Sequence, residues 1–322
     1  MSRTDFFIVG LLLAIAGLLL LANYGERFAT ARILSFIASG LIAGTALSFG
    51  LLGLVLVSIR QAAGDISAAD ARTAQLASFS LVVAGAVGLL IFIPGLQRAL
   101  ARAFGRTTNS PLAHAVAVLL LIFLALQLPF VFGGPPQGIP PITSVDIIAQ
   151  DAPLVLIAFI GVGLLARRSL PETVQRLGLV PPKQARWWLV ALLAIPAFIG
   201  IATGIDAVGN LIAPASQRQV SNVSTMLFSQ FNTVPAVVFL GLTAGVAEEV
   251  LFRGAMLPRF GVLITALLFA AVHTQYALTF ATLEVFVLGL GLGWLRRAGG
   301  TLPAIVTHAG YDITVGILSL HH

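Results

Sequence analysis

Two adjacent glutamates and an arginine one helical turn away are the residues best suited to chemistry. Glu248 and Glu249 precede Arg253 within an otherwise apolar stretch. In a helix, Glu249 and Arg253 occupy positions i and i+4, in the acid-first order that favours an ion pair. Glu248 is turned by about 100° from Glu249 and can face another neighbour. The fragment therefore offers one carboxylate held by the arginine and one freer carboxylate able to act as a base.

Two histidines and a further acid follow at the same spacing. Phe269 and His273 are four residues apart, as are His308 and Asp312. Imidazoles and carboxylates accept and donate protons in catalysis, and they also bind zinc. Glu248, His273 and His308 are therefore candidate ligands for a divalent metal such as zinc. A metal-free mechanism uses the same residues, and the sequence specifies no cofactor.

The composition shows what must position these groups. The chain has 322 residues, of which 58% are hydrophobic and 9% charged, with a mean hydropathy of +1.01. A soluble domain carries about 25% charged residues. The formal charge of +6 comes from basic residues between apolar runs, where they orient helices rather than bind nucleic acid. Cysteine is absent, which excludes disulfides, thiolate nucleophiles and cysteine-based zinc sites. The composition therefore predicts an integral membrane protein.

Apolar runs long enough to cross a hydrocarbon core of about 30 Å recur along the chain. They predict an all-α bundle of about ten transmembrane helices, with the catalytic core in the C-terminal helices. The first run is predicted to be a retained helix rather than a signal peptide. The seventh and eighth runs could form one hairpin. The predicted spans are 6–23, 33–59, 76–96, 112–132, 152–166, 187–205, 234–257, 261–277, 279–295 and 303–320.

A Pro/Gly-rich loop at 133–150 is the predicted boundary between two parts of the chain. Residues 1–132 form N-terminal transmembrane helices of unassigned role. Residues 151–322 form the predicted catalytic core, whose motifs fall within 234–320.

Loop charges predict the orientation in the membrane. With ten spans, most basic residues fall on one side: Arg27, Arg32, Arg98, Arg102, Arg106, Arg167, Arg168, Arg176, Lys183, Arg186, Arg259, Arg296 and Arg297. The other side holds Arg3, Arg60, Arg72 and Arg218. The positive-inside rule makes the richer side cytoplasmic, with both termini outside, and the predicted location is the cell (inner) membrane. Counted from that side, the acids and imidazoles lie about 8–18 Å deep, in the cytoplasmic half.

Ionisable side chains inside a bilayer are costly and therefore functional candidates by default. Nearly all of them gather in the last part of the chain. A buried Glu–Arg pair can, however, serve only to lock helices together. Outside the motifs, Glu284 is predicted to pair with a neighbour or line a cavity, and Asp206 to be solvated near a helix end.

Several intramembrane hydrolase patterns are not matched. No H-E-x-x-H zinc motif occurs. Ile37-Ala38-Ser39-Gly40 lacks the first glycine of a rhomboid-like G-x-S-G site, and the aspartyl protease motifs are imperfect and in the wrong order.

The pattern that fits is E-E-x-x-x-R, then F-x-x-x-H, then H-x-x-x-(N or D). Glu248 to Arg253, Phe269 to His273 and His308 to Asp312 supply these motifs in order. At these residues the chain resembles the CPBP family, which includes CAAX prenyl protease type 2 (Rce1-like) and bacteriocin-processing Abi intramembrane proteases. The front helices do not contribute to the resemblance.

The resemblance implies hydrolysis of a peptide bond near the membrane. By family analogy, Glu248 and His273 activate a water as general base, and Arg253 orients Glu249. His308 and residue 312 would stabilise the oxyanion. Asp312 replaces the commoner asparagine, and an ionised carboxylate cannot donate to an oxyanion. It would have to be protonated, orient His308 or bind a metal.

The implied partners are the lipid bilayer and a peptide or lipidated-protein substrate, with no nucleic acid. Neither prenylation of the substrate nor the oligomeric state follows from the sequence. Two other functions remain open. Intramembrane acids and histidines also build proton-coupled transporters, although those tend to show inverted repeats. A non-catalytic scaffold or immunity protein could keep the motifs for helix packing alone.

Overall fold

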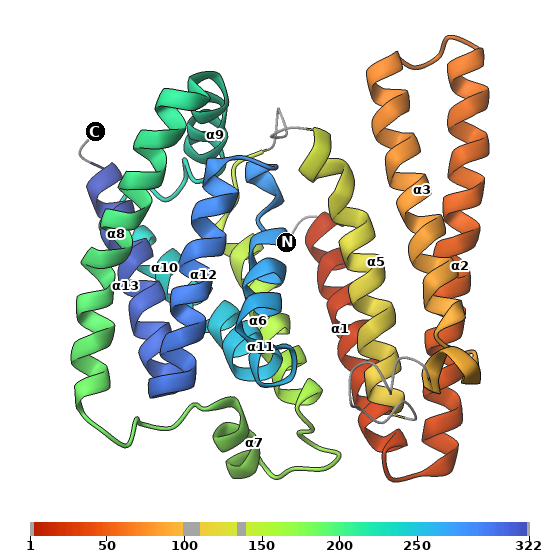
Figure 1. Ribbon diagram of the computed structural model, residues 1–322, viewed down its shortest axis with the longest axis horizontal. Coiled ribbons are helices and arrows are strands. Elements are labelled where there is room, and N and C mark those ends of the chain that lie inside the picture. The colour runs from red at the N-terminus through yellow and green to blue at the C-terminus, as the bar shows by residue number, and fades with distance from the viewer. Residues whose placement is uncertain (1–2, 99–109, 134–139, 321–322) are drawn as a thin grey trace. The chain divides into compact units, whose positions relative to one another are not determined.

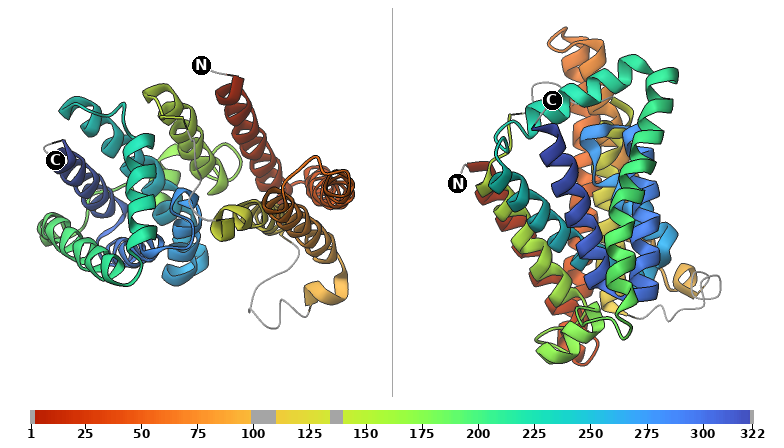
Figure 2. Two further views of the ribbon diagram at one scale, coloured as in Figure 1. Left: turned by 90° about the horizontal axis from the view of Figure 1, so that it is seen from above. Right: turned by 90° about the vertical axis from the view of Figure 1, so that its left-hand side faces the viewer.

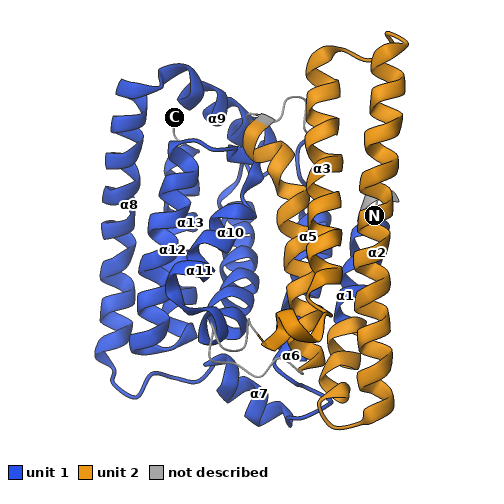
Figure 3. Cartoon of the chain, turned by 45° about the vertical axis from the view of Figure 1, so that its right-hand side comes forward, with its two compact units in different colours: residues 1–16, 134–322 blue, residues 17–133 orange. Residues whose placement is uncertain are grey.

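The computed structural model describes residues 3–98, 110–133 and 140–320. Of the residues in these ranges, 85% are helical and none forms a strand, so the predicted all-α fold is confirmed. Two compact units are present, residues 17–133 and residues 1–16 with 134–322 (Figure 3). Arg102 and Arg106, from the predicted basic loop, lie outside the described residues.

Unit 2, which is orange in Figure 3, is built from long apolar helices. They are α1 (Arg3–Gly25, whose first residues belong to the other unit), α2 (Ala29–Ala62), α3 (Ala68–Leu90) and α5 (Pro111–Gly133). The Ser67 side chain caps α3 by accepting from the Asp70 N–H, which satisfies a free donor of the first turn. Helices α2 and α3 pack closely, since a Cβ at Gly85 would lie 2.4 Å from Leu47 N.

Unit 1, which is blue in Figure 3, holds the three motifs. Its elements are α6 (Ser144–Gly161), α7 (Leu170–Leu177), α8 (Arg186–Ile212), α9 (Pro214–Leu227), α10 (Val234–Glu248), the π-helix η1 (Glu249–Met256), α11 (Leu257–Ala271), the 3₁₀ turn η2 (Thr274–Tyr276), α12 (Phe280–Gly299) and α13 (Thr301–Ser319). Helix α13 packs against α8, α10 and α12 (Figures 1 and 2). The last motif, on α13, thus lies beside the first, on α10 and η1.

The second motif reaches the first because the chain reverses at Gly261. This residue has φ +79° and ψ 172°, a conformation that favours glycine. The rings of Phe252 and Phe269 are 5.2 Å apart on the two sides of the turn. In one straight helix these residues would be about 25 Å apart. The seventh and eighth predicted spans therefore form a hairpin.

Seven helical segments are long and apolar enough to cross a membrane, among the residues that the structure describes. They are Phe6–Gly25, Ala29–Ala62, Ala68–Leu90, Pro111–Phe132, Ser144–Gly161, Arg186–Ile212 and Val234–Ala271, the last of which contains the turn at Gly261. Helices α12 and α13 are of similar length, 20 and 19 residues, but carry the polar groups of the site. The chain is an integral membrane protein, and the count of ten spans stays a prediction.

Helix boundaries differ from the predicted ones where local capping decides them. Helix α6 begins at Ser144 rather than at residue 152, because Thr143 and Asp146 form a capping box that satisfies the first free N–H groups. Helix α3 begins at Ala68 rather than at residue 76, after its Ser67 cap. Helices α7 and α9 were not predicted, because neither is a long apolar run.

Candidate active site

The two glutamates lie where the backbone changes from one helix type to another. Glu248 is the last residue of α10, and Glu249 opens the eight-residue π-helix η1. A π-helix has wider turns than an α-helix and occurs frequently at functional sites. The sequence analysis assumed α-helical geometry for this fragment, but the structure has a π-helix from Glu249 onward. Glu248 and Glu249 point toward different neighbours.

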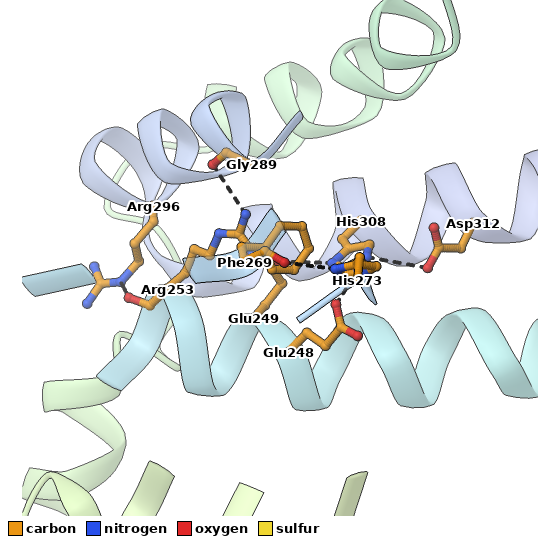
Figure 4. Close-up of polar contacts among 9 residues, drawn as sticks. All are labelled: Glu248, Glu249, Arg253, Phe269, His273, Gly289, Arg296, His308 and Asp312. Atoms are coloured by element: carbon orange, nitrogen blue, oxygen red, sulfur yellow. Dashed lines mark hydrogen bonds and ion pairs between the residues drawn. The ribbon is translucent and has the colours of Figure 1, made fainter. Parts of the chain in front are cut away.

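Glu249 and Arg253 form the ion pair that their spacing predicts. Arg253 Nη1 donates to Glu249 Oε1 at 2.7 Å, and both side chains are fully buried. Arg253 Nη2 donates to the Gly289 carbonyl of α12 at 3.2 Å. The guanidinium also lies 4.1 Å from the centre of the Phe269 ring, at cation–π distance. Arg253 thus ties η1 to both α11 and α12 (Figure 4).

Two further arginines hold the backbone of η1. Arg296 Nε donates to the Arg253 carbonyl at 3.1 Å, and Arg176 Nη1 donates to the Gly254 carbonyl at 3.2 Å. Sequence analysis used these two arginines only to predict the orientation in the membrane. Their hydrogen bonds to η1 join residues 43 and 78 positions apart, and no helical spacing could have indicated them.

His308 connects α13 to both glutamates. Its Nδ1 lies 2.8 Å from Glu249 Oε1, and because an ion-paired carboxylate only accepts, Nδ1 carries the hydrogen. Its Nε2 is 3.4 Å from Asp312 Oδ2 and 4.0 Å from Glu248 Oε2. The ring therefore uses one nitrogen to hold its orientation and turns the other toward two carboxylates.

His273 follows the end of α11, with its ring held by its own helix. Nδ1 donates to the Phe269 carbonyl at 2.8 Å, so Nε2 of the neutral ring has a free lone pair. The ring centre of Phe269 is 4.9 Å from that of His273 and 5.8 Å from that of His308. Both imidazoles thus contact one phenyl ring, and Figure 4 shows them in one cluster with Glu248.

Glu248 is less restrained than Glu249. Its side chain is 16% exposed, and Oε2 is buried without a hydrogen-bond partner. Asp151 of α6, which is 7% exposed, interacts electrostatically with it. Sequence analysis missed Asp151 because it lay at the edge of the predicted loop, one residue before a predicted span. It adds a third buried acid beside the two glutamates.

Close packing of α10 on α13 brings the motifs together. A Cβ at Gly245 would lie 2.9 Å from Ala309 N, and one at Gly241 would lie 2.8 Å from Ile313 Cγ1. Gly241 and Gly245 form a G-x-x-x-G pattern, which allows helices to approach closely in membranes. Sequence analysis overlooked this pattern, although it ends three residues before Glu248.

The candidate metal ligands do not form a metal site. Among the described residues, no three His, Asp or Glu side chains are placed to hold one ion. Nδ1 of each histidine is engaged, with Phe269 O in one case and Glu249 in the other, so Nε2 is the ring nitrogen that could bind an ion. Glu248, His273 and His308 do not meet around one point in this arrangement.

The two acids outside the motifs have other partners. Tyr311 donates to Glu284 Oε1 at 2.7 Å, between α13 and α12. Gln217 Nε2 donates to Asp206 Oδ1 at 3.0 Å, and Asp206 is exposed. Glu284 thus pairs with a neighbour, one of the two roles predicted for it.

Comparison with known proteins supports the resemblance found in the motifs. Residues 230–314 match the family model of type II CAAX prenyl endopeptidase Rce1-like proteins. An uncharacterized 24.3 kDa protein of Escherichia coli is 33% identical over 146 residues, which cover 41% of this chain and 62% of the relative. The uncharacterized protein YpbD of Bacillus subtilis is 34% identical over 86 residues, covering 25% and 45%.

The chain thus spans less than two thirds of the length of each of these relatives. No solved structure matches it. The matched segment runs from the residues before α10 into α13 and contains all three motifs. The predicted resemblance to the Rce1-like family is therefore confirmed for this part of the chain.

Proposed function

We propose that the protein is an intramembrane endopeptidase of the CAAX-processing type, which hydrolyses a peptide bond near the membrane surface with a water activated by Glu248 and His273. The observation that carries this proposal is the convergence of His273 and His308 on Phe269, with Glu248 beside His308. They come from three elements of the segment that matches the endopeptidase family.

Glu248 suits the general base because one of its oxygens is not committed to the protein. Glu248 Oε2 has no hydrogen-bond partner, and the side chain is 16% exposed. Glu249 also has one oxygen without a partner, but its side chain is fully buried and its Oε1 accepts from both Arg253 and His308. A base must reach the proton it removes within about 2.6–3.2 Å. The free lone pair of His273 Nε2 would accept a second hydrogen bond from the same water and orient it.

Glu249 and Arg253 act as a support for the site. Their charges compensate each other in a fully buried pair, and Glu249 orients His308 through Nδ1. Such orienting contacts determine which imidazole nitrogen is available for chemistry. Neither residue would contact the substrate.

His308 and Asp312 would stabilise the tetrahedral intermediate. A protonated His308 donates from Nε2 toward the developing oxyanion, the interaction that lowers the barrier of acyl transfer. Asp312 Oδ2 lies 3.4 Å from the same nitrogen. This distance supports orientation and charge compensation of His308, rather than donation to the oxyanion, as the role of Asp312.

The substrate class follows from the family description. Type II CAAX prenyl endopeptidases cleave prenylated C-terminal peptides, and a lipidated substrate would remain at the membrane during cleavage. We propose that this protein cleaves a peptide or lipidated protein in the cytoplasmic half of a cell membrane. The family match favours this function over a transporter or a scaffold.

The test uses the full chain in proteoliposomes with prenylated and unprenylated C-terminal peptides, and mass spectrometry of the released fragments. Glu248→Gln is expected to lower the cleavage rate about 10²–10⁴-fold, the usual contribution of a general base. Glu284→Gln is the matched control, because it replaces a membrane carboxylate outside the motifs and keeps an acceptor for Tyr311. Cleavage by Glu248→Gln at the wild-type rate, or proton-coupled flux without cleavage, would overturn the proposal.

A further inference from the structure

A positively charged pocket lies in unit 1, at the short helix α7 between α6 and α8. Figure 1 shows where α7 lies. Its volume is about 400 Å³, and its lining is Arg167, Arg168, Glu172, Gln175 and Arg176. None of these residues belongs to the three motifs. The pocket is therefore separate from the candidate active site.

Guanidinium groups dominate the charge of this pocket. Three arginines and one glutamate line it. Burial lowers the pKa of Arg176, and repulsion from Arg168, Arg296 and Arg259 lowers it further. Several positive charges are thus gathered within electrostatic reach of one another. An anion bound among them would relieve this repulsion.

Hydrogen bonds hold the lining in place. Arg168 Nη1 donates to the Val162 carbonyl, and Arg176 Nη1 donates to the Gly254 carbonyl. The Glu172 carboxylate accepts from the N–H and hydroxyl of Ser169 in a capping box. Arg168 and Arg176 are therefore positioned by the protein before any ligand arrives.

Helix α7 is itself anchored to the bundle. Leu177 and Thr173 are fully buried, and Thr301, the first residue of α13, donates through N–H to the Gly178 carbonyl and through its hydroxyl to the Leu177 carbonyl. The pocket is thus a fixed part of the unit rather than a feature of a free loop.

The position of the pocket identifies the kind of anion. It follows α6 and precedes α8, two helices long and apolar enough to span a membrane, so it lies at the level of a lipid headgroup. Leu170 and Val180, at either end of the α7 segment, are 57% and 41% exposed, as expected of side chains that contact acyl chains. Basic pockets at such positions bind anionic headgroups.

We propose that this pocket binds the phosphate of an anionic membrane phospholipid. Arginine suits this ligand because its planar guanidinium donates two parallel hydrogen bonds to phosphate oxygens. Arg176 also donates to the carbonyl of Gly254, the residue that follows Arg253 in η1. An arginine of the lipid site thus also contacts the backbone of the candidate active site. The binding site does not depend on the proposed peptidase activity.

The test is retention of lipid by the full chain released from nanodiscs of phosphatidylcholine mixed with phosphatidylglycerol, read by native mass spectrometry. The wild type is expected to retain phosphatidylglycerol selectively. The double variant Arg167→Gln/Arg168→Gln should lose affinity by roughly fivefold for each arginine. Arg297→Gln, an exposed arginine outside the pocket, is the matched control and should retain lipid as the wild type does.

Glu172→Gln distinguishes loss of the site from loss of the fold. Glutamine also serves at this position of a capping box, so α7 should keep its cap while the pocket loses its one negative charge. Retention of phosphatidylglycerol should therefore rise, a gain that misfolding cannot produce. Equal retention of both lipids by the wild type, no change in the double variant, or displacement of the lipid by inorganic phosphate alone at comparable concentration would overturn the proposal.

Discussion

Nδ1 of His308 lies 2.8 Å from Oε1 of Glu249, the same oxygen that accepts from Arg253 at 2.7 Å. One buried carboxylate oxygen thus joins α13 to η1, across 59 residues of sequence. Because this contact uses Nδ1, it leaves Nε2 of His308 facing Glu248 and Asp312. The candidate site depends on this contact.

Removal of the Arg253 guanidinium should therefore destabilise the protein as well as inactivate it. Arg253→Met leaves the fully buried Glu249 carboxylate without its counter-ion, and loss of one partner of a buried pair costs about 3–5 kcal/mol. Thermal unfolding in detergent measures this effect. The double variant Glu249→Gln/Arg253→Met should recover much of the stability, because no buried charge remains, but not the cleavage activity. Equal losses of stability in the single and double variants would contradict this account.

The close packing of α10 on α13 predicts that a larger residue at Gly245 lowers both stability and cleavage activity. A methyl group at Gly245 would meet the backbone of Ala309 at 2.9 Å, so Gly245→Ala should cost about 1–3 kcal/mol and reduce cleavage by displacing His308. Gly200→Ala in α8 is the matched control, since no atom lies within 4 Å of its Cβ. That change should leave activity intact and stabilise the helix by about 0.5–1 kcal/mol. Thermal unfolding and cleavage assays of both variants check this.

Substitution of His273 should lower activity but not stability, whereas substitution of His114 should lower stability but not activity. His273→Ala is expected to lower kcat about 10²–10⁴-fold with little loss of stability, because its ring bonds only to its own helix and is part-exposed. His114→Ala, in the other unit, removes contacts with Ser110 O and Gln97 and should cost about 1–3 kcal/mol while cleavage continues. Normal turnover by His273→Ala would remove it from the mechanism.

The hydrogen bond between Tyr311 and Glu284 should contribute to stability rather than catalysis. Tyr311→Phe keeps the ring against Phe198 but leaves the Glu284 carboxyl without its donor, at a cost of about 1–3 kcal/mol. Glu284→Gln retains an acceptor and should cost less. If Tyr311→Phe abolished cleavage without changing the unfolding temperature, the pair would belong to the reaction itself.

Metal removal should leave the activity unchanged. The described His, Asp and Glu side chains form no three-ligand group, so they would have to move before they could hold an ion. Dialysis against a strong chelator, followed by the cleavage assay and metal analysis of the same sample, tests this. Activity lost with the chelator and restored by added zinc would show that the donors rearrange around an ion.

Much of the local structure could be predicted from the sequence. Long apolar runs require helices, because a bilayer offers no partners for free backbone groups, and the i,i+4 spacings of Glu249 with Arg253 and of His308 with Asp312 place each pair on one helix face. Helix starts at Ser67 and Thr143 could also have been read from their caps. The order of the three motifs was enough to indicate the family.

The tertiary structure alone decided which atoms meet. The π-helical turns of η1, the reversal at Gly261 and the close approach at Gly245 set the distances between α10, α11 and α13. These distances let Glu249 bind His308 and leave Glu248 Oε2 without a hydrogen-bond partner. They also bring Asp151 and Arg176 to the site, although no sequence spacing connects these residues to the motifs. Contacts between residues distant in sequence depend on packing of whole helices, and helical periodicity carries information only about neighbours within a few turns.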